Sequence, residues 1–408
     1  SRLEKKTKFI NKSLVEIGNK PVISYIIDKF PKSTEFVIAL GYKGELVKQY
    51  LLLAYPKRKF YFKKINPYSG KKSGLGITLL QCKNFLQKPF LFISCDSIIS
   101  HKVKEIKYNW VGFSNVRDSS NYRCLLTKKN EVIEFLEKNS VKKSKKAYIG
   151  FAAIKDYHTF WSALSKNNDK AKKEGEVLGL RAILKNNKIN AIKLKWHDTG
   201  NIVSYNKVKE IYSNKKGLNI LEKPNETIWF HKDFVIKFST DEKFISKRIK
   251  RSKIIQEFVP KILDYEKKMY KYQYVKGNVL SSVLSLSLFK SLLFNLKKFW
   301  LVKNLNVRQS KFFYDSCYRF YYLKSLKRIK LFYLNSKKID QENIINNIKI
   351  PKLSKLLKKI NWIFISKGLP GRFHGDLHFE NILFNKKNKK FTFLDWRQDF
   401  ENNIKVGD

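Results

Sequence analysis

A polar segment near the end of the chain is the feature that most constrains its fold. The segment carries His374-Gly375-Asp376, then Asn381, and a second aspartate, Asp395. Apolar stretches at 382–384 and 391–394 flank a turn rich in Lys and Asn, a pattern that predicts two short strands. Carboxylate and amide oxygens are ligands that Mg²⁺ prefers. The segment therefore predicts a catalytic hairpin that presents acidic and amide groups together.

The D-x-x-x-x-N spacing from Asp376 to Asn381 resembles the catalytic loop of protein kinases, with Gly375 in place of their Arg. Because Asp395-Trp396 replaces D-F-G, the segment resembles the aminoglycoside phosphotransferase and choline kinase superfamily. The resemblance implies that Asp376 accepts or orients the proton of an attacking hydroxyl, while Asn381 and Asp395 hold Mg²⁺ on the phosphates of ATP. A buried structural His with solvated acids is the alternative interpretation.

The kinase resemblance covers about residues 225–408. The strand-like segment 234–238 carries Lys237, which resembles the phosphate-binding lysine of the kinase N-lobe. An exposed strand lysine is the alternative. The acid that pairs with this lysine in the family would fall near Lys250, where the sequence is basic, and Glu242 and Glu257 are the other candidates.

The first half of the chain alternates strand-like and helical segments, a pattern typical of α/β folds with a mostly parallel sheet. The strand-like segments are 35–40, 60–62 and 89–94, and the helical ones are 44–53 and 78–86. The apolar stretch 279–289 in the second half predicts a core helix, since it is too short to span a bilayer.

Ser1-Arg2-Leu3 and Lys12 resemble the start of sugar-nucleotide pyrophosphorylases and related nucleotidyltransferases. The resemblance implies that Arg2 and Lys12 bind the NTP phosphates and that Gly74 recognises the base. It also implies a Rossmann-like, GT-A-like domain. Asn11 replaces the usual Pro of the family, and the family's Gly-rich turn before Ser1-Arg2-Leu3 is missing from the chain.

Asp96 and Asp198 resemble the two Mg²⁺ aspartates of the same family. We expect them to converge on one Mg²⁺ at the C-terminal edge of the sheet. Glu137-Lys138 and Gly150 resemble the segments that contact the acceptor. Each signal has a simpler alternative, because a strand-end Asp is often a helix cap and a Gly-x-Gly is often a turn.

The composition restricts the partners and the compartment. Lys and Arg number 85 against 34 acidic residues, a formal net charge of +51. The lysines are spread along the chain among Asn, Ile, Phe and Tyr, which is typical of A/T-rich codon usage and does not indicate specific nucleic-acid binding. The four cysteines have scattered spacing, so we expect a cytoplasmic protein. We expect no membrane insertion, and the oligomeric state stays open.

These observations predict two fused enzymes. We expect a nucleotidyltransferase domain at 1–215 and a two-lobed α+β kinase-like domain at 220–408, with lobes at about 222–277 and about 278–408, joined by a linker at 213–219. Both ends look cut.

The expected function is bifunctional. ATP would phosphorylate a small hydroxyl acceptor, either a sugar or an amino alcohol, and a second NTP, CTP or UTP, would then activate the phosphate ester with release of pyrophosphate. The product would be a precursor of capsule or lipopolysaccharide. The alternatives are a chain with one regulatory half, or a basic nucleic-acid-binding or scaffold protein with decayed catalytic folds.

Overall fold

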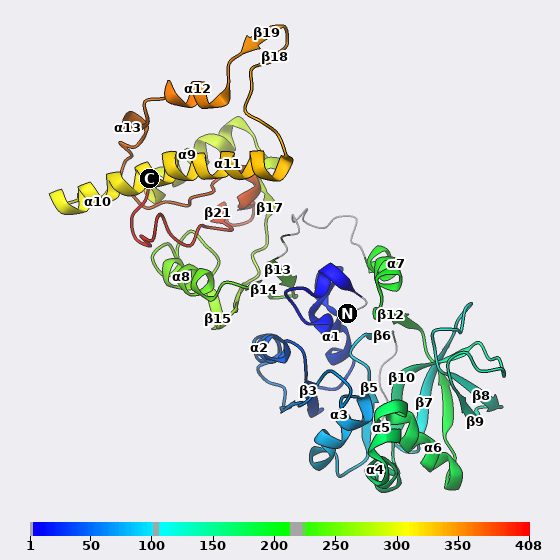
Figure 1. The fold of residues 1–408 in the computed structure, drawn as a ribbon. Helices are drawn as coiled ribbons and strands as arrows, with labels where there is room; N and C mark the ends of the chain where they lie inside the picture. The colour runs from blue at the N-terminus through cyan, green and yellow to red at the C-terminus, as the bar shows by residue number, and fades with distance from the viewer. Residues whose placement is uncertain (1–2, 101–105, 213–222, 224) are drawn as a thin grey trace. The chain divides into compact units, whose positions relative to one another are not determined.

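The computed structural model describes residues 3–100, 106–212, 223 and 225–408, which form two compact units (Figure 1). The first unit comprises residues 1–231 with 235–240, and the second comprises 232–234 with 241–408. The expected linker at 213–219 lies outside the described residues. The domain limits at 1–215 and 220–408 stay a prediction.

The first unit mixes strands and helices. Its strands are β1 (Glu16–Ile17), β2 (Lys20–Pro21), β3 (Phe36–Leu40), β4 (Phe60–Lys64), β5 (Phe90–Ile93), β6 (Ser97–Ile99), β7 (Trp110–Asn115), β8 (Cys124–Lys128), β9 (Glu131–Leu136), β10 (Lys146–Ile154), β11 (Asn190–Lys193), β12 (Trp196–Asp198), β13 (Glu226–Phe230) and most of β14 (Phe234–Ser239). Its helices are α1 (Val22–Ile27), α2 (Gly44–Ala54), α3 (Leu75–Cys82), α4 (Tyr157–Lys166), α5 (Asn168–Glu174), α6 (Glu176–Asn186) and α7 (Ile202–Tyr212).

The expectation of a mostly parallel sheet is wrong. The main sheet has six strands in the order β5-β10-β7-β11-β9-β8, and among the described strands of the first unit only the pairs β3–β4 and β7–β11 are parallel. A parallel pair needs a long crossover connection, usually a helix. In the described part of the chain no α-helix interrupts the run from β5 to β10. The first unit is therefore a mixed α/β fold.

Helices α4, α5 and α6 pack together beside β7 and β10 (Figure 1). Phe160 and Trp161 of α4 are almost fully buried and contact the ring of Phe90 on β5. Burial of one such side chain stabilises the fold by about 1.5–3 kcal/mol. This core supports β5, whose C-terminal end leads directly to Asp96.

The hairpin β13–β14 has contacts with the start of the chain within the first unit. Trp229 is fully buried, and its Nε1 donates to the carbonyl of Leu14 at 3.1 Å. The amide of Phe230 donates to the carbonyl of Asn19 at 2.8 Å. The strand-like segment expected at 234–238 is present as β14, and the packing of the hairpin against the start of the chain is a tertiary contact.

The second unit contains short strands and longer helices. Its elements are α8 (Glu242–Ser252), β15 (Ile262–Glu266), β16 (Met269–Gln273), β17 (Asn278–Val279), α9 (Leu286–Phe299), α10 (Val307–Tyr318), the π-helical turn Arg319–Leu323, α11 (Lys324–Ser336), β18 (Asn343–Ile345), β19 (Ile348–Ile350), α12 (Leu353–Lys358), α13 (Trp362–Ile365), β20 (Ile382–Asn385) and β21 (Lys390–Phe393). The predicted hairpin at 382–394 is present as β20–β21. The core helix expected at 279–289 begins only at Leu286, because Asn278–Val279 pairs with β20 instead.

The core of the second unit joins α8, α9 and the β20–β21 hairpin. Its centre includes Ile249, Phe299, Phe393 and Trp396. Among the described residues, no helix combines the length and apolarity needed to cross a bilayer.

Gly76 permits the close approach of α3 and α5, which supplies the first prediction. A Cβ atom at Gly76 would lie 2.2 Å from the carbonyl oxygen of Ala171. We expect Gly76→Ala to lower the free energy of unfolding by about 1–3 kcal/mol, because the helices must separate. The measurement is urea unfolding. The control is Leu75→Ala at a neighbouring exposed position, and equal stability of the two variants would contradict the packing argument.

Candidate active sites

The lysine at position 12 lies on a short capped helix. Asn11 precedes the 3₁₀ turn Lys12–Leu14, and its Oδ1 accepts a hydrogen bond from the amide of Ser13 at 2.9 Å. Nζ of Lys12 donates to Oδ2 of Asp96 at 2.8 Å, and the two side chains are 44% and 22% exposed. Asn11, which departs from the family pattern, thus caps the turn that carries Lys12.

Asp96 and Asp198 are brought together by two paired strands. In the antiparallel pair β6–β12, Asp198 lies opposite Ser97, the residue after Asp96. The carbonyl of Asp96 accepts hydrogen bonds from the amide of Thr199 at 2.9 Å and from its hydroxyl at 2.8 Å. Residues far apart in the sequence therefore lie close together, and their shared ion stays a prediction.

The carboxylate of Asp198 is held by three donors. The amide of Gly200 donates to Oδ1 at 2.8 Å, Nδ2 of Asn201 donates to Oδ2 at 3.1 Å, and the Tyr122 hydroxyl donates to Oδ2 at 3.0 Å. The Tyr122 ring makes an edge contact with Trp196. The sequence analysis missed Tyr122, since it lies in a loop before β8 and belongs to no recognised motif.

The two aspartates fit a Mg²⁺ ion. Mg²⁺ is usually held by one or two carboxylates together with substrate phosphates and water. The ammonium of Lys12 on Asp96 shows that the pair already attracts a cation. Within the described residues no group of three or more His, Cys, Asp or Glu side chains could hold a metal by itself, so the remaining ligands would come from phosphate and water. The metal role of Asp96 and Asp198 stays a prediction.

Gly150 lies next to the loop that carries Asp96. Its φ is +68°, and a Cβ atom there would lie 2.4 Å from Oγ of Ser94. The amide of Ser94 donates to the carbonyl of Gly150 at 2.8 Å. A larger residue would push this loop away, so glycine permits the close approach of the two segments at Gly150 and Ser94.

Glu137, the predicted acceptor contact, is paired with two arginines. Nε of Arg123 donates to its Oε2 at 3.0 Å, and Nη2 of Arg181 donates to its Oε1 at 2.7 Å. Partial burial raises the pKa of Glu137, but the two guanidinium groups outweigh burial and the net pKa is lowered. Lys138 is exposed beside it. Neither arginine was identified from the sequence.

Gly74 and Arg2 are the other two residues of the first unit that are predicted to contact the nucleotide. Gly74 precedes α3, and a Cβ atom there would lie 2.6 Å from the carbonyl of Lys172, so this glycine has a packing role whatever its role in base recognition. Arg2 lies outside the described residues.

Lys237 is buried and pairs with an acid on the neighbouring strand. Its Nζ lies 3.1 Å from Oε2 of Glu226, across the β13–β14 hairpin. The sequence offered three candidate partners for Lys237, namely a residue near Lys250, Glu242 and Glu257. Glu226 was not among them. The partner was expected on the helix after Lys237, whereas Glu226 lies on the strand that pairs with the strand of Lys237.

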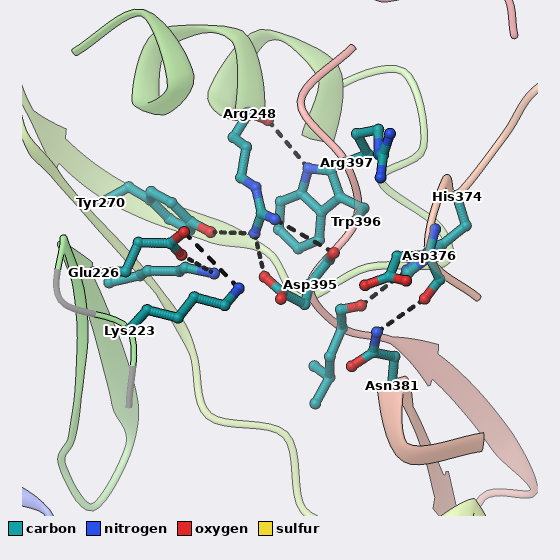
Figure 2. A network of polar contacts seen from close by, with 12 residues as sticks. Lys223, Glu226, Arg248, Tyr270, His374, Asp376, Asn381, Asp395, Trp396 and Arg397 are labelled. Carbon is teal, nitrogen blue, oxygen red and sulfur yellow. Dashed lines mark hydrogen bonds and ion pairs between the residues drawn. The ribbon is translucent and has the colours of Figure 1, made fainter. Parts of the chain in front are cut away.

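The second unit assembles the predicted catalytic loop (Figure 2). Nδ2 of Asn381 donates to the main-chain oxygen of Asp376 at 2.8 Å, which fixes the D-x-x-x-x-N loop. His374 is buried, its Nε2 lies 2.8 Å from the carbonyl of Leu394, and its Nδ1 accepts from the amide of Asp376 at 3.3 Å. The acceptor role of Nδ1 places the proton on Nε2. The Asp376 side chain is exposed.

Asp395 does not fit a free Mg²⁺ ligand. Its Oδ1 accepts from Nη1 of Arg248 on α8 at 2.7 Å, and its carbonyl accepts from Nη2 at 3.3 Å (Figure 2). One oxygen of this carboxylate is therefore engaged by a guanidinium, and the metal role of Asp395 stays a prediction. Arg248 belongs to the basic stretch at 248–251, in which the sequence analysis recognised only a missing acid.

Arg397 and Asp399 have separate contacts. The guanidinium of Arg397 lies 4.9 Å from the ring centre of Phe320, and a Cβ atom on Gly375 would be 2.7 Å from its side chain. Asp399 pairs with Lys247 at 2.7 Å. Gly375, where protein kinases have Arg, thus leaves room for an arginine from another segment.

Comparison with known proteins relates the chain to one group. The bifunctional protein GlmU of Methanococcus maripaludis is 29% identical over 213 residues, covering 49% of each chain, and that of Methanococcus vannielii is 30% identical over 131 residues, covering 31% of this chain and 30% of the other. The chain spans about half the length, or less, of these relatives. No family model matches.

Two solved structures are also similar. One is an apo UDP-glucose pyrophosphorylase (20% identity, TM-score 0.45, covering 52% of this chain and 93% of that chain). The other is the CTP:phosphocholine cytidylyltransferase of Streptococcus pneumoniae (20% identity, TM-score 0.41, covering 52% and 93%). The N-terminal region of this chain has a mixed α/β fold, and its sequence is similar to part of the GlmU relatives.

The contact between Tyr122 and Asp198 generates a prediction about metal affinity. Tyr122→Phe removes one donor that orients the carboxylate, so we expect Mn²⁺ to bind the first unit about tenfold more weakly. The measurement is a Mn²⁺ titration by electron paramagnetic resonance in the presence of NTP. Tyr108→Phe, at an exposed position, should bind as the wild type does, and an unchanged affinity in Tyr122→Phe would show that the hydroxyl does not orient Asp198.

His374 generates a prediction about acid stability. Burial, assisted by Arg251 and Arg248, lowers its pKa from 6.5 to about 4. The neutral form is therefore favoured in the folded state. As the pH falls from about 6.5 towards about 4, the unfolded chain binds a proton at His374 that the folded chain does not. The free energy of unfolding therefore decreases. Between about pH 7 and about pH 4.5 this loss amounts to about 2 kcal/mol.

We expect His374→Gln to lose about 2 kcal/mol less than the wild type over this range, because no buried imidazole remains. Urea unfolding at both pH values measures the difference. His378→Gln, at an exposed position, should behave as the wild type. An equal loss in all three proteins would assign the acid sensitivity to other groups.

Proposed function

We propose that the first unit is a Mg²⁺-dependent nucleotidyltransferase. The observation that supports this most is the pairing of β6 with β12, which sets Asp96 beside Asp198 and leaves Lys12 on the first of them. Two carboxylates and a mobile lysine at one sheet edge suit a polyphosphate with its divalent ion.

The proposed reaction is a displacement at the α-phosphorus of an NTP. An oxygen of the acceptor phosphate forms a bond to that phosphorus, the bond to the bridging oxygen breaks, and pyrophosphate leaves with the electron pair. Mg²⁺ on Asp96 and Asp198 would neutralise charge on the phosphates. Lys12 would move from Asp96 to the phosphates, with Arg2 beside it, and Gly74 would contact the base. Tyr122 would keep Asp198 oriented.

The acceptor would lie along the β9–β10 side of the site. Glu137, held between Arg123 and Arg181, is a fixed carboxylate that can accept hydrogen bonds from hydroxyl groups. Lys138 would pair with the acceptor phosphate, and Gly150 would let the acceptor come close to Asp96.

A second activity, small-molecule phosphotransfer, is proposed for the kinase-like half. The specific observation is the loop in which Asn381 and His374 fix the main chain around an exposed Asp376. Asp376 would accept the proton of an acceptor hydroxyl as its oxygen attacks the γ-phosphorus of ATP and ADP leaves. The phosphate-binding role that the sequence suggests for Lys237 stays a prediction.

The two activities would be consecutive, because one makes a phosphate ester and the other consumes one. ATP and a second NTP, CTP or UTP, would convert a sugar or an amino alcohol into an activated precursor for cell-surface polysaccharide. Fusion raises the local concentration of each site near the other. An active first unit with a regulatory second unit is the other candidate, supported by the occupied Asp395.

The test is a substrate screen that scores the two reactions separately. The full chain receives choline, ethanolamine or hexoses with ATP and CTP or UTP, and both phosphate transfer and pyrophosphate release are measured. We expect Asp198→Asn to lower pyrophosphate release by about 100-fold or more and leave phosphorylation intact, and Asp376→Ala to do the reverse.

Each outcome assigns one half. Normal pyrophosphate release by Asp198→Asn would refute the metal role of that aspartate. Unchanged phosphorylation by Asp376→Ala would refute the base. Phosphorylated acceptors that the first unit never activates would refute the consecutive scheme while leaving the separate activities in place.

A further inference from the structure

Arg248 is an immobilised cation at the position where the second unit would take its metal. Its side chain is 6% exposed, whereas that of Asp395 is 31% exposed. The guanidinium lies 4.6 Å from the ring centre of Phe244 and 5.6 Å from that of Trp396, and Nη1 also reaches the Tyr270 hydroxyl at 3.3 Å. Figure 2 shows Tyr270, Trp396 and Asp395 around the guanidinium. These contacts hold it in one place.

The buried contacts of Arg248 indicate that its position serves the pairing with the carboxylate of Asp395. Nε of Arg248 is buried and has no hydrogen-bond partner among the described residues. Such a group is costly in a site optimised only for stability. An arginine guanidinium stays charged in proteins, so any divalent ion at Asp395 would meet a fixed like charge.

We propose that Arg248 keeps the metal position at Asp395 closed, so that Asp395 becomes a Mg²⁺ ligand only when the guanidinium is removed from it. The inference rests on the proposed phosphotransfer role of the second unit and adds a regulatory contact to that site. With the contact in place Asp376 is available, but the ion that would neutralise the ATP phosphates lacks one of its two expected ligands. Phosphotransfer by the second unit is held off in this conformation.

Two other cationic side chains of α8 make contacts that are purely structural. Arg251 is as deeply buried, but its donors are directed at the backbone carbonyls of Arg397 and Phe373, so it holds chain segments together. Lys247 pairs with Asp399, which belongs to no predicted metal site. Arg248 alone among these three directs a donor at a predicted metal ligand.

The experiment measures Mn²⁺ binding to the full chain by electron paramagnetic resonance. Asp96→Asn and Asp198→Asn are introduced first, so that the first unit contributes no site. In this background we compare the parent protein, Arg248→Gln and Arg248→Lys, each with and without Asp395→Asn. Gln keeps a donor for Asp395 without charge, whereas Lys keeps the charge. Lys247→Gln is the matched control, since it removes a cation from the same helix.

We expect Arg248→Gln to bind one Mn²⁺ about tenfold or more tightly than the parent, which corresponds to about 1.4 kcal/mol. Asp395→Asn should abolish this gain, and Arg248→Lys and Lys247→Gln should show none. A Mn²⁺ site in the parent that is lost on Asp395→Asn would overturn the proposal, because the guanidinium would then not exclude the metal. No gain in folded Arg248→Gln, checked by circular dichroism, would also overturn it.

If Arg248→Gln does not fold, Mn²⁺ binding by the parent and by Arg248→Lys, each with and without Asp395→Asn, tests the proposal instead. Weak binding by the parent and by Arg248→Lys, unchanged by Asp395→Asn, supports the closed position, and Asp395-dependent binding by either refutes it. The readout does not use catalysis, so failure of the phosphotransfer proposal would appear separately, as lack of acceptor phosphorylation by a variant that binds Mn²⁺.

Discussion

The hydrogen bonds from Thr199 to the carbonyl of Asp96 are the contacts on which the first unit's site depends. They join the loop after β5 to the residue after β12, and they add to the β6–β12 pairing that brings the two aspartates together. Because both bonds use the main-chain oxygen of Asp96, its carboxylate stays available for Lys12 or an ion. Tyr122 and Asn201 then orient the second carboxylate without taking it out of the site.

The aspartates of the two predicted metal sites have different cationic partners. The partners differ in how far they are exposed to solvent. Lys12 is a flexible side chain, almost half exposed, so solvent screens its pair with Asp96 and an ion can replace it at small cost. Arg248 is buried among aromatic rings, and moving it would break a largely buried ion pair with Asp395, which costs more than breaking an exposed one. The same kind of contact is therefore exchangeable in one unit and fixed in the other.

Local patterns identified single elements well and their pairing poorly. The strands expected at 35–40 and 89–94 and the hairpin at 382–394 are present, because apolar alternation and turn residues act locally. The mostly parallel sheet was wrong, since the strands from β6 to β10 follow one another with no helix among the residues described there, and they pair mainly antiparallel. The segment 279–289 was wrong as a continuous helix because its first residues pair with β20.

The residue types of the candidate sites follow from the sequence alone: Lys12, Asp96 and Asp198 in one half, and Asp376, Asn381 and Asp395 in the other. Which of these charges meet depends on the tertiary structure. The pairing of Lys237 with Glu226, of Glu137 with two arginines, and of Asp395 with Arg248 joins residues from different elements. Coulomb attraction depends on distance and burial, which no local pattern encodes.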